Sequence, residues 1–203
     1  MEEKIIMKIL PTNKKSIKQA IKILHNGGVI VYPTETTYGI GCDATNKKAV
    51  LRIFKIKKRS KANNLPIICA TKKMVKDFFK ISKKEQELAK KYWPGPLSIV
   101  LSLRGAYSRR GNLVIGTPVR VSSDKIVYLL SFGLKKPITA TSANISGDGP
   151  FYNAKDVYDN FKNRKYQPDL ILDSGRLKKN KPSTIVELKD DNIFVIRRGE
   201  IKL

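Results

Sequence analysis

Apolar residues near the start of this chain recur with the spacing of a helical face. After the capping cluster Pro11-Thr12-Asn13, the apolar positions 17, 20, 21 and 24 predict a helix that Gly27-Gly28 ends. A second stripe over residues 49–54 predicts a helix whose carboxyl end carries the basic run Lys57-Lys58-Arg59. These two stripes indicate helices that each bury one face against a core.

Further along the chain, capping and breaking signals predict three more helices. Ser82 with Glu85 three residues later is a capping-box pattern, which predicts the start of a helix. Trp93-Pro94-Gly95-Pro96 ends this helix. A short helix is predicted over residues 124–130, and another over 154–161, where apolar residues share one face.

Short apolar runs between these helices predict strands. The run at 29–32 is continuous, as in a central strand, and Pro33 ends its hydrogen-bond ladder because proline has no donor. We interpret residues 33–41, with the sequence PTETTYGIG, as a polar turn beyond that strand. The other predicted strands are 65–70, 97–103, 113–121, 170–172, 184–188 and 193–197. Their irregular alternation with helices predicts an α/β (α+β) fold, with a twisted mixed sheet flanked by helices.

Length and composition limit the organisation of the chain. Its 203 residues, of which 41% are hydrophobic, predict one compact domain over residues 1–203. No apolar run approaches the roughly 20 residues of a membrane span, and the amino-terminal residues lack the pattern of a signal peptide. We therefore expect a cytoplasmic protein without membrane association. Cys42, Cys69 and His25 lack metal-ligand spacing, so neither a disulfide framework nor a bound metal is predicted.

The charge balance changes this picture. The chain has 41 Lys and Arg against 17 Asp and Glu, a net charge of +24. Such a field concentrates phosphates and polyanions, and it favours salt-sensitive binding of nucleic acid. Lysines are spread along the chain, however, and scattered lysines also form ordinary solvated faces. The charge therefore indicates anionic ligands without specifying them.

The candidate phosphate-binding groups are side chains, because the chain lacks both common glycine-rich phosphate loops. Lys57 provides a point charge, and Arg59 a fork that grips two oxygens of one phosphate or carboxylate. Taken alone, the pair also fits a basic helix end that complements its own dipole. Ser142 and Asn144, after a buried-looking strand expected over residues 137–141, offer groups that donate and accept hydrogen bonds, although such a turn is often structural. Arg120 lies in an apolar strand and must face either solvent or an anion.

Several ordered motifs in this chain resemble the YrdC/Sua5 family of threonylcarbamoyl-AMP synthases. The resemblance extends over about residues 15–201, and the chain resembles the short, single-domain branch because it stops before the additional carboxyl-terminal Sua5 domain. The matching motifs are YPTETTYGIGCDA at 32–44, IFKIKKR at 53–59, WPGPL at 93–97, VRV at 119–121, TATSANISG at 139–147, PSTIV at 182–186 and IRRGEI at 196–201.

This resemblance implies both a fold and a reaction. The fold is YrdC-like, with a large positively charged cavity. The reaction converts L-threonine, bicarbonate and ATP, with Mg²⁺, into threonylcarbamoyl-AMP and pyrophosphate for the N6-threonylcarbamoyladenosine modification of tRNA. A downstream threonylcarbamoyl-transferase complex would receive the product. Carried over by residue, the resemblance makes Lys57, Arg59, Ser142 and Asn144 catalytic and ATP-binding, adds Arg197 for ATP, and assigns threonine to Thr34, Asn64, Arg120, Thr141 and Ser183.

The motifs also depart from the family pattern in places. Lys58 stands where many relatives have glycine, Ser60 where they often have proline, and Gly149-Pro150-Phe151-Tyr152 replaces Pro-Ser-Pro-Thr. These departures concern the nucleotide contacts of the 147–153 loop rather than the reaction. Two alternatives stay open from the residues alone. One is a non-catalytic module that binds tRNA or double-stranded RNA, and the other is an ATP-dependent carbamoyl-transfer enzyme that uses a different amine.

Overall fold

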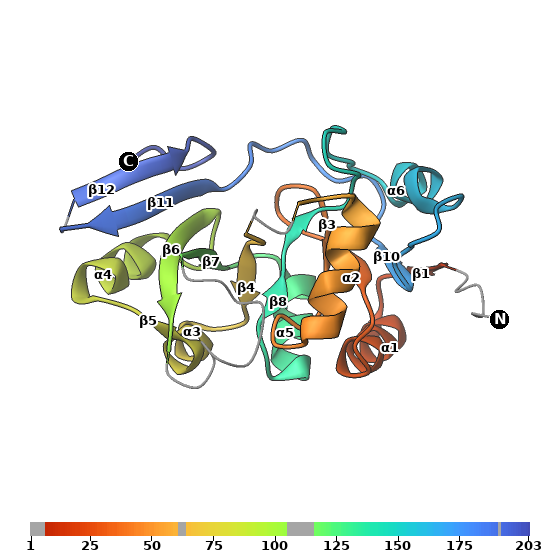
Figure 1. The fold of residues 1–203 in the computed structure, drawn as a ribbon, viewed down its shortest axis with the longest axis horizontal. Helices are drawn as coiled ribbons and strands as arrows, with labels where there is room; N and C mark the ends of the chain where they lie inside the picture. Colours follow the sequence, from red (N-terminus) through yellow and green to blue (C-terminus); the bar gives the residue numbers. More distant parts are fainter. Residues whose placement is uncertain (1–6, 61–63, 105–115, 191) are drawn as a thin grey trace.

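The strands of this protein form two sheets that lie side by side (Figure 1). The computed structural model describes residues 7–60, 64–104, 116–190 and 192–203. The first sheet has the order β1-β10-β2-β3-β9. Its strands are β1 (Lys8–Pro11), β10 (Leu170–Asp173), β2 (Ile30–Pro33), β3 (Tyr38–Gly41) and β9 (Thr141–Ser142).

The second sheet has the order β12-β11-β6-β7-β4-β8, and β5 pairs with β6. Both sheets contain parallel and antiparallel pairs, which confirms the prediction of a mixed α/β fold. The strands arrange in two sheets, however, rather than in one. The strands of the second are β12 (Asn192–Arg197), β11 (Thr184–Lys189), β6 (Leu97–Leu103), β7 (Thr117–Val121), β4 (Ile67–Cys69), β8 (Ile138–Thr139) and β5 (Phe79–Lys80).

Each of the six helices in the described part of the chain begins at a side chain that caps backbone amides. The predicted capping box of Ser82 and Glu85 is present. None of the described helices is long and apolar enough to cross a membrane. The helices are α1 (Lys14–His25), α2 (Lys47–Lys57), α3 (Lys72–Phe78), α4 (Lys83–Tyr92), α5 (Lys125–Leu134) and α6 (Ala154–Phe161).

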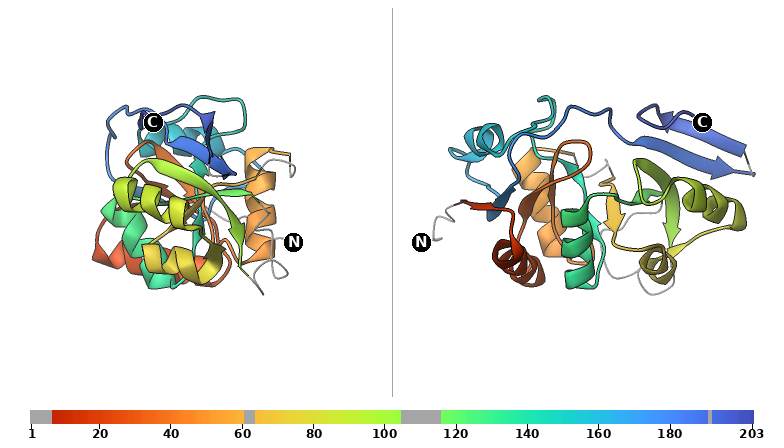
Figure 2. Two further views of the ribbon diagram at one scale, coloured as in Figure 1. Left: turned by 90° about the vertical axis from the view of Figure 1, so that its left-hand side faces the viewer. Right: turned by 180° about the vertical axis from the view of Figure 1, so that it is seen from behind.

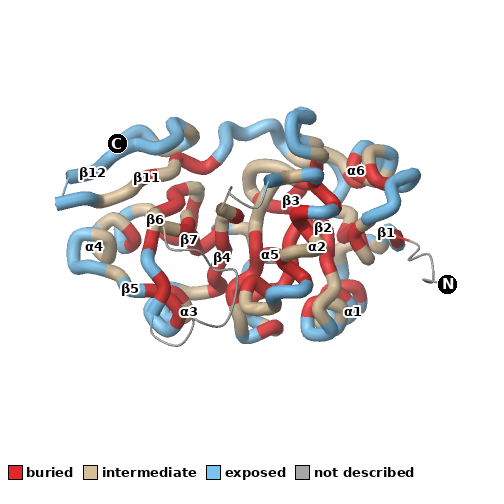
Figure 3. The backbone as a smooth tube through the Cα atoms, in the orientation of Figure 1, coloured by how far each residue is buried: buried red, intermediate tan, exposed pale blue. Residues whose placement is uncertain are grey.

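Both faces of the first sheet are covered, because side chains of a strand alternate between its faces. Val31 packs in one apolar cluster with residues of α2 and α6, whereas Ile30 and Tyr32 pack in another with residues of α1 and α5. Figure 3 shows the consequence: β2 and β3 are buried along their whole length. Two-sided burial explains why residues 29–32 form a continuous apolar run.

The second sheet has one apolar face and one that carries polar groups. Ile99 and Val119 pack in a cluster that includes residues of α3 and α4. Their neighbours Ser98 and Arg120 therefore lie on the opposite face of β6 and β7, where both are buried. This buried polar face is the first structural sign of a site. The right-hand view in Figure 2 shows β11 and β12 at one end of the molecule and α1 and α6 at the other.

Three expectations about the elements differ from the structure. The PTETTYGIG segment is only partly a turn, because Tyr38–Gly41 is a buried strand that pairs with both β2 and β9. The strand expected over 113–121 is β7, and residues 113–115 lie outside the described residues. Helix α3 was not predicted from the sequence. It is short, and its buried residues Val75 and Phe78 are too few to make a clear stripe.

Candidate functional site

Lys57 is the last residue of α2 and is almost fully buried, with 1% of its surface exposed. The helix ends there because Lys58 adopts a left-handed conformation with φ of 50°. The Lys57 amine donates hydrogen bonds to the backbone carbonyl oxygens of Ser142 and Asn144, the latter at 2.7 Å. The structure therefore joins the predicted Lys-x-Arg and Ser-x-Asn elements directly.

The environment of Lys57 lowers its pKa to about 7. Burial of the amine is the main cause, and the positive charge of Arg59 acts in the same direction. The carboxylate of Asp148 acts in the opposite direction and favours the charged form. A lysine in this state gains a proton readily when an anion approaches, which suits a phosphate-binding role.

The turn after β9 is fixed by the groups around it. The Ala143 amide donates to the Tyr38 carbonyl oxygen at 2.9 Å, and the Ser146 amide donates to the Lys57 carbonyl oxygen at 2.9 Å. The Asn144 side-chain amide donates to the carbonyl oxygens of Ile145 and Asp148. These hydrogen bonds stabilise the loop that follows β9. The Asn144 side-chain oxygen lies 3.5 Å from the Lys57 amine.

Two hydrogen-bond donors near the Lys57 amine have no hydrogen-bond partner within the described part of the chain. The Ser142 hydroxyl makes no hydrogen bond there. The Nε atom of Arg59 is buried and unpaired among the described residues, while its Nη2 donates to the Asn64 carbonyl oxygen at 3.1 Å. Burial also lowers the pKa of Arg59. We name Lys57, Arg59, Ser142 and Asn144 the Lys57 group; its unused donors suit an oxyanion.

Arg120 is buried on β7 and pairs with Glu35, which lies in the loop between β2 and β3. The second Glu35 carboxylate oxygen accepts a hydrogen bond from the Ser122 hydroxyl at 2.6 Å. The pKa of Arg120 is lowered to about 10, mainly by burial, and the positive charge of Arg197 acts in the same direction. Arg120 therefore remains charged at neutral pH and lies within electrostatic reach of a second arginine.

Arg197 and Ser183 are in direct contact. Arg197 on β12 donates to the Ser183 carbonyl oxygen at 2.8 Å and to its hydroxyl at 2.9 Å. The Ser183 hydroxyl also lies 3.3 Å from that of Ser98 on the polar face of β6. A residue predicted for ATP thus holds one predicted for threonine. We name Arg120, Ser183 and Arg197 the Arg120 group.

Three further predicted residues have mainly structural contacts. The Thr34 hydroxyl accepts hydrogen bonds from the amides of Thr36 and Thr37 and donates to the Thr37 carbonyl oxygen, so it fixes its own turn. Asn64 donates to the Gly116 carbonyl oxygen at 3.1 Å. Thr141 pairs with Ile40 in the sheet, next to Ser142. None of these contacts tests the predicted threonine-binding roles.

Sequence reasoning missed the acidic partner of the Arg120 group. Glu35 lies in the PTETTYGIG segment, which the sequence indicates only as a polar turn, and Ser122 belongs to no motif. No local pattern indicates either residue, because Glu35 and Arg120 are 85 positions apart, with Glu35 in a loop of the first sheet and Arg120 on a strand of the second. The buried charge of Arg120 was the available signal, since a buried arginine needs a carboxylate or another acceptor.

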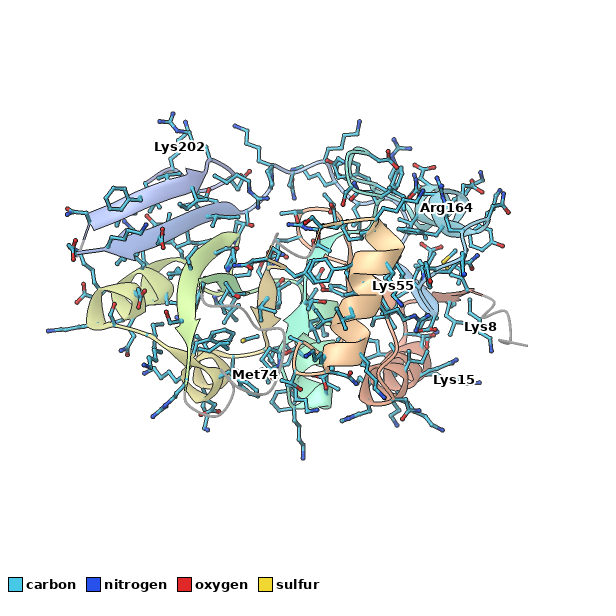
Figure 4. The ribbon with its side chains drawn as sticks, viewed as in Figure 1. Lys8, Lys15, Lys55, Met74, Arg164 and Lys202 are labelled. Carbon is cyan, nitrogen blue, oxygen red and sulfur yellow. The ribbon has the colours of Figure 1, made fainter. Side chains whose placement is uncertain are left out.

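The basic side chains outside these groups are dispersed. Figure 4 labels Lys8 and Lys15 toward the end of the molecule that carries the amino terminus, Lys55 on α2, and Lys202 near β12. Within the described residues, no three His, Cys, Asp or Glu side chains are placed to hold a metal ion. The positive charge of the protein therefore covers several elements rather than one of them.

Comparison with known proteins shows the family to which this chain is similar. The model of the Sua5/YciO/YrdC family, which carries the description "Telomere recombination", matches residues 22–199. A protein of Methanocaldococcus jannaschii, named provisionally as a threonylcarbamoyl-AMP synthase, is 33% identical over 98% of this chain and 94% of its own length.

Two solved structures show the same fold. The structure of P. abyssi Sua5 in complex with L-threonine superposes with a TM-score of 0.84 at 30% identity and covers 96% of this chain. This chain spans only 57% of that protein. The structure of E. coli YciO gives a TM-score of 0.80 at 27% identity, with 96% of this chain and 94% of YciO covered.

Proposed function

This chain belongs to the Sua5/YciO/YrdC family, and we propose that it is a threonylcarbamoyl-AMP synthase. The relative from M. jannaschii that carries this name matches nearly the whole chain, and the related P. abyssi Sua5 has been solved with L-threonine. The observation in the structure that supports the proposal best is the Lys57 group, in which a buried lysine and a half-buried arginine meet at one turn.

The proposed reaction has two steps. The ammonium group of L-threonine first loses a proton, and the resulting amine attacks the carbon of bicarbonate, which forms a carbamate with loss of water. A carbamate oxygen then attacks the α-phosphorus of ATP, and the bond to the leaving pyrophosphate breaks. Both reactants of the second step are anions, so the site must offset their repulsion. Lys57, Arg59 and Arg197 would supply positive charge where negative charge develops.

The threonine-binding residues proposed here are Thr34, Asn64, Arg120, Thr141 and Ser183. Arg120 suits the substrate carboxylate, because a guanidinium binds a carboxylate through two parallel hydrogen bonds. Ser183 is held by Arg197 and is 8% exposed, so its hydroxyl has a fixed position. Discrimination of threonine from other amino acids by its methyl group contributes only about 1–3 kcal/mol in a pocket.

Magnesium would enter with ATP. Mg²⁺ in nucleotide sites is commonly bound by substrate phosphates, so we expect the triphosphate to carry the ion. Mg²⁺ would neutralise part of the triphosphate charge, while Lys57 and Arg59 orient its oxygens. We further propose a cytoplasmic role in N6-threonylcarbamoyladenosine synthesis on tRNA, with transfer of the intermediate to a separate threonylcarbamoyl-transferase complex.

Binding of tRNA or double-stranded RNA is the second candidate function, and the net charge of +24 favours it. RNA binding does not require the Lys57 group to be buried. A non-catalytic RNA-binding module would bind RNA with a steep salt dependence and would not distinguish L-threonine from L-serine or L-valine. The two functions therefore differ in their dependence on the amino acid.

The deciding experiment incubates the purified protein with Mg-ATP and labelled bicarbonate, with and without L-threonine. We expect labelled threonylcarbamoyl-AMP and pyrophosphate to appear together, and only when threonine is present. L-serine and L-valine serve as controls for the amine. RNA binding without formation of either product would contradict the enzyme proposal and favour the RNA-binding module.

A further inference from the structure

Glu35 is a largely buried carboxylate that two distant parts of the chain hold in place. One of its oxygens pairs with Arg120 on β7, and the other accepts the Ser122 hydroxyl at 2.6 Å. Its backbone carbonyl oxygen accepts a hydrogen bond from the Asn180 side chain at 2.8 Å. The exposed fractions of the Glu35 and Arg120 side chains are 16% and 8%. The pair is therefore largely removed from water.

Packing alone does not require charges at this position. Apolar residues of similar size often stabilise a protein as well as a buried ion pair does, because both charges lose their hydration. The turn that carries Glu35 is already fixed by the Thr34 hydroxyl, which bonds to Thr36 and Thr37. A chemical reason other than folding can thus account for a carboxylate here.

A second carboxylate near Arg120, that of Asp124, is occupied by backbone amides. Asp124 lies close enough to influence the pKa of Arg120, but its side chain accepts hydrogen bonds from the amides of Ile126 and Val127 at 2.8 and 3.1 Å. It caps α5. Glu35, by contrast, is held only by side chains, which can rearrange when a ligand arrives.

We propose that Glu35 binds the ammonium group of the amino-acid substrate while Arg120 binds its carboxylate. A free α-amino acid carries one positive and one negative charge on two groups that are bonded to the same carbon atom. Glu35 and Arg120 offer the opposite charges side by side, and in the unliganded protein they neutralise each other. Binding exchanges this internal pair for two pairs with the substrate, so neither buried charge loses its partner.

This inference rests on the proposed function and defines its substrate class. The site accepts a free α-amino acid whose primary amine and carboxylate are both unmodified. An acid that lacks the amine would still reach Arg120, but it would leave Glu35 buried and unpaired, which is unfavourable. Amine recognition at Glu35 would also place the nitrogen that forms the carbamate beside a fixed group.

The test is titration calorimetry on the full chain with two ligands, L-threonine and 2,3-dihydroxybutyrate, in which a hydroxyl replaces the amine. We expect the wild-type protein to bind threonine at least tenfold more tightly. In Glu35→Gln, threonine affinity should fall at least tenfold, whereas affinity for the analogue should stay the same or rise. Glu35→Asp, which keeps the carboxylate, should retain the preference for threonine. Glu87→Gln, an exposed position on α4, is the matched control and should behave as wild type.

Two results would overturn the inference. Unchanged threonine affinity in Glu35→Gln would show that Glu35 does not bind the amine. Tighter binding of both ligands in that variant would show that Glu35 only competes for Arg120. Absence of threonine binding in the wild type is a different failure, because it would remove the proposed function and the inference together. Thermal melting of each variant establishes that it is folded before its affinities are compared.

Discussion

The side-chain nitrogen of Lys57 lies 2.7 Å from the backbone carbonyl oxygen of Asn144, although 87 positions separate the two residues in the chain. This hydrogen bond joins the carboxyl end of α2 to the turn after β9. It makes the Lys-x-Arg and Ser-x-Asn elements one unit, so a change in either should affect the other.

Removal of either basic side chain of this unit should reduce catalysis strongly. We expect Lys57→Ala and Arg59→Ala each to lower formation of threonylcarbamoyl-AMP by at least about two orders of magnitude, the scale of losing one transition-state charge partner. Lys48→Ala removes an equal charge from the exposed side of α2 and should keep normal activity. Near-normal turnover in both site variants would contradict the assignment of the Lys57 group.

Nucleotide binding should become coupled to proton uptake above neutral pH. The Lys57 pKa of about 7 means that its amine is charged below pH 7 and mostly neutral above it in the free protein. An anionic triphosphate favours the charged amine, so binding at pH 8 should take up a proton, and affinity should fall as the pH rises. Calorimetry in buffers of different ionisation enthalpy measures this uptake. Lys57→Met should abolish it, and an equal uptake in that variant would assign the proton to another group.

Lys58→Gly should stabilise the fold. Lys58 has φ of 50°, a left-handed conformation that is unfavourable for a residue with a side chain and easy for glycine. We expect a gain of up to about 1 kcal/mol in the free energy of unfolding, measured with urea, since the entropy of glycine in the unfolded chain offsets part of the relief. Lys48→Gly, in the first turn of α2 and not at a left-handed position, should instead destabilise. A loss of stability in Lys58→Gly would mean that the lysine side chain makes a compensating contact.

Gly41 should not tolerate a side chain. A Cβ atom there would lie 2.0 Å from the Thr139 carbonyl oxygen and 2.9 Å from the Tyr32 hydroxyl, where β3 passes the junction of the two sheets. We expect Gly41→Ala to lower the free energy of unfolding by about 1–3 kcal/mol, the usual range for overpacking. Gly149→Ala is the control, because nothing lies within 4 Å of its added Cβ atom. Equal melting temperatures for the two variants would contradict the close approach.

Local patterns predicted most helices and strands because they depend on neighbours in sequence. The helix caps at Asn13 and Ser82 and the apolar stripe of α2 each act within one or two turns. Strand β3 was not predicted from the sequence, because two of the four residues in YGIG are glycines, which are unfavourable inside a strand. The structure explains these glycines, because a Cβ atom would lie 3.3 Å from the Tyr32 ring at Gly39 and 3.0 Å from it at Gly41.

The sequence by itself determined which residue types are available to the site. It contains Lys57, Arg59, Ser142, Asn144 and Arg120 in motifs that a family shares, and it identifies Arg120 as a charge in an apolar strand. These inferences needed no coordinates, because composition and spacing limit the chemistry that side chains can perform.

Only the tertiary structure decided how these groups meet. It buried Lys57 against the carbonyl oxygens of a turn 85 to 87 positions away and so lowered its pKa. It also placed Glu35, in the loop between β2 and β3 of the first sheet, against Arg120 on β7 of the second. Both effects arise from removal of charges from water and from contacts between distant segments. A pKa and an ion pair of this kind depend on distances in space, which spacing along the chain does not fix.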